Sequence, residues 1–561
     1  MLTQFVSEHL EDDTSRLLLS RGRWPHIDMD LAVACIESRR KLKGKVQEWY
    51  DNPSLIFPAK LSAEQCSSSA TASYKSALAE RIASADGWKI ADLTGGLGVD
   101  SWFFSRRAGK VLYNEMQPGL CKAASHNFKA LGACNIEVSN HAVSSDPVPE
   151  TAEASPSSIL GSFSPDVVYM DPARRGEGGK KVFLIEECTP DVLNLKDEIF
   201  TVSRHILIKL SPMADISMVC SRLGETCREV HVVAYGGECK ELLIWMDREW
   251  KEEYSVHAIE LPTDFPASQQ SVFTFFPSEE KNASDNVNMA TCHCEDTVSG
   301  NLPGKTLYLF EPGKALMTAG AFNLVSIRME IAKLGKSTHY YLLESDEQIA
   351  RLKGLGKVYR ILKCEPLDKR TMKAAGKDFP KAEVTARNIP MDTDTLRKKL
   401  GVTSGDDAHI FGLKSDLCGN ILLCTKRVLQ EDLETHGNKD EATCEFSLGF
   451  PSGTEEVADE NSGCRKKRGN HTYNQNRFPY IYLQEGKGDT YCKSIYAGCH
   501  SHCKHRPDRE IGVDLKVLIP VGGILYHVSS YDAKEDKRYP MVYRAHEISK
   551  AYSKEVSYDR H

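Results

Sequence analysis

The stretch KIADLTGGLGVD, residues 89 to 100, decides the fold. Its first five residues, 89–93, read as a strand, and a helix is expected from about Val99. Glycines stand between the two segments, and glycine lets the backbone approach a ligand closely. Open α/β sheets bind their ligands at the carboxyl ends of their strands. The stretch therefore predicts a strand, a ligand-binding turn and a helix.

The same order of strand, turn and helix recurs downstream. Further strands are expected at 111–115, 135–140, 166–170, 205–210, 229–235 and 240–246. This rhythm is typical of a parallel sheet covered by helices on both faces. The last two strands are joined only by GGEC, which is too short for a helical crossover, so they should be antiparallel.

Acidic residues end the first two strands. Asp92 closes the first strand, and Glu115 closes the second, where a carboxylate can accept both hydrogen bonds of a ribose diol. Together with the glycines they suit an adenosine-containing ligand, the alternative being an ordinary βαβ turn with a surface glutamate. Ser101 stands where a dinucleotide motif would place its third glycine, which disfavours a nicotinamide-dependent oxidoreductase.

The order of these pieces resembles a class I S-adenosylmethionine-dependent methyltransferase. More narrowly, LSAEQCSSSATASYKSAL, DLTGGLGVDSWFFS, VVYMDPARR, IKLSP and GGECKELLIW resemble a bacterial methyltransferase family with a ferredoxin-like segment and a C-terminal THUMP-like domain. EPGKALMTAGAF (311–322) and KAEVTARNIPMDTDTLRKKLGV (381–402) resemble those two segments. The resemblance covers about residues 1–428.

The resemblance implies a Rossmann-like class I methyltransferase sheet, a helical N-terminal region and a C-terminal α+β THUMP-like module. It also implies S-adenosylmethionine as cofactor and structured RNA, a tRNA or rRNA, as partner. The expected parts are a helical region 1–60, the methyltransferase domain 61–250, a linker with the ferredoxin-like segment 251–346, the THUMP-like domain 347–428 and an extension 429–561. The residues expected to hold the donor are Asp92, Thr94, Gly95, Gly96, Gly98, Asp100 and Glu115.

The end of the fourth strand, DPARR, is the expected catalytic segment. Asp171 and Pro172 occupy the place of the (Asn/Asp)-Pro-Pro-aromatic motif of amino-methyltransferases, which accepts hydrogen bonds from an exocyclic amine. Ala173 and Arg174 replace the second proline and the aromatic residue, so that a guanidinium would stack on the base or hold a phosphate.

Four other interpretations of DPARR remain open. Asp-Pro-x-Arg also occurs in uracil C5 methyltransferases, but IKLSPMAD has no nearby cysteine to serve as their nucleophile. The motif could be no more than a capped turn with solvated arginines. An RNA-binding protein whose methyltransferase fold has lost turnover, or a methyltransferase with a non-RNA substrate, would fit the altered motif as well.

Two clusters lie outside the predicted sheet. A locally basic stretch in the THUMP-like region offers RNA contacts at Lys369, Arg370, Lys373, Lys377 and Arg387, or is simply a solvated helix face. In the tail, TYCKSIYAGCHSHCKHRP gathers soft ligands for zinc at Cys492, Cys499, Cys503 and His505, although it lacks a paired CxxC spacing. No other metal ligands are expected. VDLKVLIPVGGILYHVSSY, near the end, is expected to form a hairpin.

Composition limits the class of protein. The formal net charge is −7, which gives no global basic field, so any nucleic-acid contact should be local. The first residues are acidic where a signal peptide is basic, and no segment has the roughly 20 apolar residues of a membrane span. The sequence therefore predicts a cytoplasmic protein with no membrane contact, and its 18 cysteines are expected to be reduced.

Overall fold

The computed structural model describes residues 1–148, 151–174, 185–266, 268–284, 287–290 and 306–428. It gives the backbone alone at residue 174 and in three strands of the tail. The chain divides into two compact units, Met1–Thr443 and Cys444–His561. In the second unit, β21 (Tyr482–Gln484), β22 (Lys516–Val521) and β23 (Ile524–Val528) form an antiparallel sheet, and the β22–β23 pair confirms the predicted hairpin.

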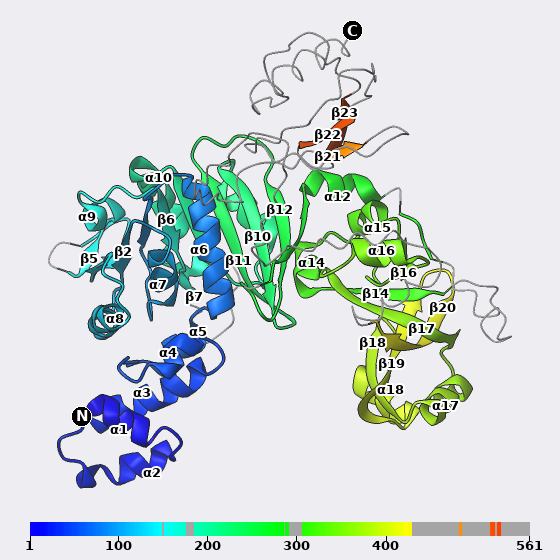
Figure 1. Ribbon diagram of the computed structural model, residues 1–561, viewed down its shortest axis with the longest axis horizontal. Coiled ribbons are helices and arrows are strands. Elements are labelled where there is room, and N and C mark those ends of the chain that lie inside the picture. Colours follow the sequence, from blue (N-terminus) through cyan, green and yellow to red (C-terminus); the bar gives the residue numbers. More distant parts are fainter. Residues whose placement is uncertain are drawn as a thin grey trace, which may run out of the picture. The chain divides into compact units, whose positions relative to one another are not determined.

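The first unit contains a nine-stranded sheet with the order β13-β12-β10-β11-β9-β6-β1-β2-β3. Figure 1 labels β2, β6, β10, β11 and β12 of this sheet. Strands β3, β2, β1, β6 and β9 run parallel, and β11 is inserted antiparallel between β9 and β10, as the short GGEC link predicts. The bounds are β1 Lys89–Asp92, β2 Lys110–Asn114, β3 Ile136–Ser139, β6 Val167–Met170, β9 His205–Leu210, β10 Cys227–Tyr235, β11 Glu238–Asp247, β12 Ser255–Leu261 and β13 Ser271–Phe275.

This sheet runs past residue 250, the predicted end of the methyltransferase domain. Strands β12 and β13 extend it beyond β10. Val256, Ala258, Phe273 and Phe275 on these strands are buried in the same core as the central strands, so the sheet would lose part of that core without them.

Helices cover both faces of the sheet. On one face α6 (Ser69–Ala83) packs over the central strands, and its start is fixed by a capping box between Ser68 and Thr71. On the other face lie α9 (Pro156–Leu160), α10 (Val192–Val202) and α11 (Ile216–Leu223). Helices α7 (Val99–Ser105) and α8 (Pro118–Ala130) follow β1 and β2. The α/β class and the mostly parallel sheet are thus as predicted.

The N-terminal region is helical. Its elements are α1 (Leu2–Glu8), α2 (Thr14–Leu19), α3 (Met29–Leu42), α4 (Gln47–Asp51) and α5 (Lys60–Gln65), with one turn of 3-10 helix at Arg21–Arg23. Short strands β4 (Ala142–Val143) and β5 (Glu153–Ala154) lie between β3 and α9, and β7 (Ala173–Arg174) pairs with β8 (Cys188–Thr189) beyond β6.

The C-terminal part of the first unit forms a seven-stranded sheet, ordered β15-β16-β14-β17-β20-β19-β18. Its strands are β14 Tyr308–Pro312, β15 Ala332–Lys333, β16 Tyr341–Leu343, β17 Gly356–Pro366, β18 Lys381–Arg387, β19 Thr403–Ser415 and β20 Gly419–Arg427. Its helices are α14 Lys314–Ala319, α15 Leu324–Arg328, α16 Asp346–Arg351, α17 Lys369–Asp378 and α18 Thr393–Leu400, and α12 (Pro277–Ala283) precedes them. Within the described ranges, we find no helix with the length and apolar character needed to cross a bilayer.

Candidate active site

The turn after β1 is organised by Asp92, whose side chain is buried. Its carboxylate accepts from the backbone amide of Thr94 (3.1 Å) and from the Ser101 hydroxyl (2.6 Å), so it ties the start of α7 to the end of β1. Burial raises the pKa of Asp92 to about 7. Asp92, buried where the strands of the sheet end, therefore has a pKa close to neutral pH.

Two glycines of this turn have no room for a side chain. A Cβ at Gly95 would lie 2.1 Å from Cε2 of the Tyr113 ring, and one at Gly98, where φ is +92°, would lie 2.8 Å from Phe128. The Tyr113 hydroxyl donates to the carbonyl of Gly96 (2.6 Å). The turn is thus held against the aromatic side chains of β2 and α8.

Glu115 follows β2 and links two loops. Its Oε2 accepts from the backbone amide of Gly96 (2.9 Å), and its Oε1 accepts from that of Gln117 (2.8 Å). Because a carboxylate has about four lone-pair sites, both oxygens keep acceptor capacity for a ligand. Glu115 therefore sets the spacing between the glycine turn and the start of α8.

Asp171 stands at the end of β6, beside the same turn. Its backbone amide donates to the Thr94 hydroxyl (2.6 Å), and its Oδ2 accepts from Lys209 Nζ on β9 (2.5 Å). Pro172, next to it, is buried. The backbone of Arg174 pairs with Cys188, while its side chain lies outside the described atoms.

Asp100 belongs to a buried charge network. Its carboxylate accepts from Ser67 (3.0 Å) and Tyr169 (2.9 Å) and lies 3.4 Å from Lys75 Nζ, and Lys75 in turn donates to both oxygens of Glu241 (2.8 and 2.7 Å). Burial would raise the pKa of Asp100, but the Lys75 and Lys209 cations hold it below its ordinary value.

A cavity of about 1240 Å³ opens over these residues at the carboxyl ends of β1, β2, β6 and β9. It brings together nearly all the site residues predicted from the sequence, namely Asp92, Thr94, Gly95, Gly96, Gly98, Asp100, Glu115, Asp171 and Pro172. Lys209 and Tyr169 also line it and were not predicted as site residues. The signal for Lys209 was one cation inside the otherwise apolar end of HILIKL.

The C-terminal sheet matches two known families. Residues 308–349 match the model of a ferredoxin-like domain, and residues 356–427 match the model of a THUMP domain-like family. The crystal structure of a candidate methyltransferase from Porphyromonas gingivalis W83 is 27% identical, covers 76% of this chain and 98% of its own, and superposes with a TM-score of 0.61. These likenesses fit a methyltransferase that carries a ferredoxin-like segment and a C-terminal THUMP-like domain.

Other solved structures resemble only part of this chain. An rRNA methylase from Streptococcus thermophilus is 14% identical, covering 31% of this chain and 94% of its own, with a TM-score of 0.22. An S-adenosylmethionine-dependent methyltransferase from Aquifex aeolicus is also 14% identical, covering 30% and 87%, with a TM-score of 0.22. Neither likeness bears on the substrate of this chain. Among curated proteins none gives a significant sequence match.

The basic residues predicted to contact RNA lie in the THUMP-like domain. All of them are exposed, with Lys369, Arg370, Lys373 and Lys377 on α17 and Arg387 at the end of β18. The opposite face of α17 is buried, and its Gly376 lies so close to α18 that a Cβ would meet the carbonyl of Leu400 at 1.8 Å. The packing of the helix therefore leaves the lysines and the single arginine of α17 exposed to solvent. The tail cysteines and His505 lie outside the described residues.

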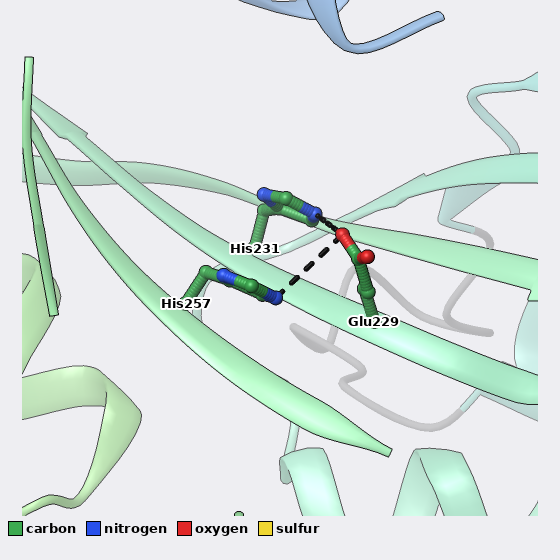
Figure 2. A group of neighbouring side chains, drawn as sticks. All are labelled: Glu229, His231 and His257. Carbon is green, nitrogen blue, oxygen red and sulfur yellow. Dashed lines mark hydrogen bonds and ion pairs between the residues drawn. The ribbon is translucent and has the colours of Figure 1, made fainter. Parts of the chain in front are cut away.

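A second ionisable cluster lies on the sheet among residues that do not line the cavity (Figure 2). Glu229, His231 and His257 place three ligand atoms within 4.8 Å of one another, and both imidazoles point at one carboxylate oxygen, with Nε2–Oε2 distances of 2.9 and 3.6 Å. Arg81 of α6 donates to both oxygens of the same carboxylate, and Tyr74 of α6 hydrogen-bonds His231 Nδ1 (2.8 Å). Since a guanidinium already balances the charge of Glu229, we interpret the cluster as an ion-pair network that fastens α6 to the sheet.

This network should make the domain sensitive to acid. Burial lowers the pKa of His231 and lowers that of His257 to about 4, while bonds from His231 and Arg81 overcome the effect of burial and hold the pKa of Glu229 below its usual range. A histidine with a depressed pKa favours the folded state above its unfolded value, near 6.5, and this contribution is lost as the pH falls toward 4. We expect the free energy of unfolding to drop by up to about 3 kcal/mol from His257 alone over that window.

Urea unfolding of the wild type and of His257→Asn at pH 7 and pH 4.5 measures this effect. The variant should lose much of the pH dependence, whereas His126→Asn, which changes an exposed histidine of α8, should keep it. Equal pH dependence in all three proteins would contradict the interpretation.

Proposed function

We propose that this chain transfers a methyl group from S-adenosylmethionine to a base of structured RNA. The observation that carries the proposal is the cavity itself, because a glycine turn, an acid after β2 and an Asp-Pro segment converge on it from three separate strands. Ligands of open α/β sheets bind at this edge, where the carboxyl ends of the strands meet.

The lining of the cavity suits a cationic donor. Its ionisable acids are Glu64, Asp92, Asp100, Glu115 and Asp171, against the two lysines Lys209 and Lys240. A sulfonium is positively charged, so an excess of carboxylates favours its binding. A Cβ built on Gly96 would meet nothing nearer than 3.9 Å, which leaves the backbone of the turn open to a ligand. When bound, the donor supplies an activated methyl group.

The cavity also has room for an acceptor. Its volume exceeds that of most small-molecule pockets, which span roughly 300–1,000 Å³. Leu61 and Met116 line it and are 61% and 48% exposed, so they offer apolar surface to an incoming ring. Asp171 would align the acceptor, and most of the rate enhancement would come from positioning. A carboxylate close to the acceptor would also stabilise the positive charge that the acceptor gains.

The THUMP-like domain supports RNA as the substrate class. Its exposed basic residues on α17 could neutralise phosphates, a contact that depends on salt and not on sequence. The cavity would then contact the base, while the basic residues of α17 contact the phosphate backbone of the RNA.

Donor binding is the first test of the proposal. We expect wild-type protein to bind S-adenosylmethionine in a calorimetric titration, and Glu115→Ala to weaken binding by about 10- to 100-fold, because it removes an acceptor for the ribose and releases the Gly96 amide. Glu137→Ala, an exposed glutamate on β3, serves as the matched control and should bind normally. Wild-type protein that binds no donor at millimolar concentration would refute the proposal.

A further inference from the structure

Lys209 and Asp171 come together because the sheet places them side by side. Strands β6 and β9 are parallel and in register from Val167–His205 to Met170–Ile208, so the next residue of each strand lies beside the other. The pleat turns both side chains to the face that also carries Tyr169. Both line the cavity, and Lys209 Nζ lies 2.5 Å from Asp171 Oδ2.

The ammonium of Lys209 stays charged in this setting. Burial would lower its pKa, but the carboxylates of Asp171, Glu241 and Asp100 outweigh burial and raise it. Only 13% of the Lys209 side chain is exposed, so its charge is compensated by these neighbours more than by water. The pair is therefore an ammonium held against a carboxylate, and the hydrogen bond from Lys209 restrains the side chain of Asp171.

This pair presents a hydrogen-bond donor next to an acceptor on the cavity wall. An ammonium has three donors, of which one is directed to Asp171, and a carboxylate has four lone-pair sites. We propose that Lys209 and Asp171 together bind the edge of an amino-bearing base, adenine or cytosine, with Asp171 accepting from the exocyclic amine and Lys209 donating to the adjacent ring nitrogen. The inference rests on the proposed function and names its substrate class.

The transfer step follows from this arrangement. The amine nitrogen forms a bond to the methyl carbon while the bond from that carbon to sulfur breaks, and its electron pair stays on sulfur. The nitrogen then releases one proton to water in the open cavity. Lys209 does not touch the methyl group in this scheme. It is a positioning residue that holds the base and Asp171 in line.

Methyl transfer to RNA tests the pair. The full chain, donor carrying a labelled methyl group and total bacterial RNA are incubated, and the RNA is then digested to nucleosides and analysed by mass spectrometry. We expect N-methylated adenosine or cytidine, with transfer by Lys209→Met reduced about 100-fold. Donor affinity of this variant should stay within about threefold of wild type, and Lys209→Arg should recover part of the rate. Lys110→Met, an exposed lysine on β2, is the matched control.

The outcomes separate the inference from the proposed function. If wild-type protein methylates no RNA, both fail. If it methylates RNA but Lys209→Met keeps its rate, or if the methyl group is found on carbon or on a ribose oxygen, only the inference on the base edge is overturned. Equal loss of donor affinity and rate in Lys209→Met would place Lys209 in the donor site and would also overturn it.

Discussion

Replacing Gly95 with alanine is expected to weaken the binding of S-adenosylmethionine severely. The new Cβ would lie 2.1 Å from the ring of Tyr113, which is fully buried and packs edge-on against Phe128. The backbone cannot simply move away, because the amide of Gly95 donates to the carbonyl of Asn114 (2.7 Å). We expect the turn to shift and donor affinity to fall by at least about 100-fold. Overpacking should also lower the free energy of unfolding by about 1–3 kcal/mol.

Calorimetry and thermal unfolding of Gly95→Ala measure both effects. The matched control is Gly119→Ala on α8, where a Cβ meets nothing within 4 Å, and this change should leave binding intact. Since alanine is favoured over glycine inside a helix, the control should be neutral or more stable by up to about 1 kcal/mol. Donor binding by Gly95→Ala within threefold of wild type would show that the glycine turn does not hold the donor.

The central sheet could be predicted because each of its strands carries a local signal. Short apolar runs bounded by turn residues mark β1, β2, β6 and β9, and the four-residue GGEC link alone fixes β10 and β11 as antiparallel. The glycine turn is also marked locally, because glycines at positions 95, 96 and 98 follow the end of β1. Patterns of this kind need no knowledge of distant residues.

The parts that escaped prediction depend on pairs far apart in the chain. Lys209 and Asp171 are 38 residues apart, and Lys75 and Glu241 are 166 residues apart. Their partnership is set by strand order and helix packing, which spacing in the sequence does not reveal. The extension of the sheet to β13 was missed for a similar reason, since only the pairing of β12 with β10 and of β13 with β12 shows that the chain after residue 250 continues the same sheet.

The ferredoxin-like segment shows the limit of periodicity. The helical periodicity of AFNLVSIRMEIAKLG (321–335) predicts one helix. In this segment the structure has only the short α15, followed by β15 at Ala332–Lys333. Glu330 has a φ of +55°, a left-handed conformation that breaks the helix, and β15 pairs with β16. Tertiary pairing therefore overrides a helical pattern here.

Lys75→Met is expected to be the most destabilising of the substitutions considered for this chain. Lys75 is completely buried on α6 and is bonded to both oxygens of Glu241, which is 2% exposed. Methionine fills a similar volume, so the main loss is the cation that compensates Glu241 and Asp100. Removal of one partner from a buried ion pair costs about 3–5 kcal/mol, because the other charge is left uncompensated. Urea unfolding at pH 7 measures the loss, and Lys122→Met, an exposed lysine on α8, controls for the substitution itself.

The double variant Lys75→Met/Glu241→Leu tests whether the buried Lys75–Glu241 ion pair serves activity or only stability. Replacing both partners of a buried pair with apolar residues is often neutral or stabilising, so the double variant should recover much of the stability that Lys75→Met loses. It should not recover transfer activity, because Lys75 and Glu241 also interact electrostatically with Asp100 and Lys209, which line the cavity. Stability regained without activity would mean that the charges position the site. If stability and transfer activity return together, the Lys75–Glu241 ion pair serves only to hold α6 on the sheet.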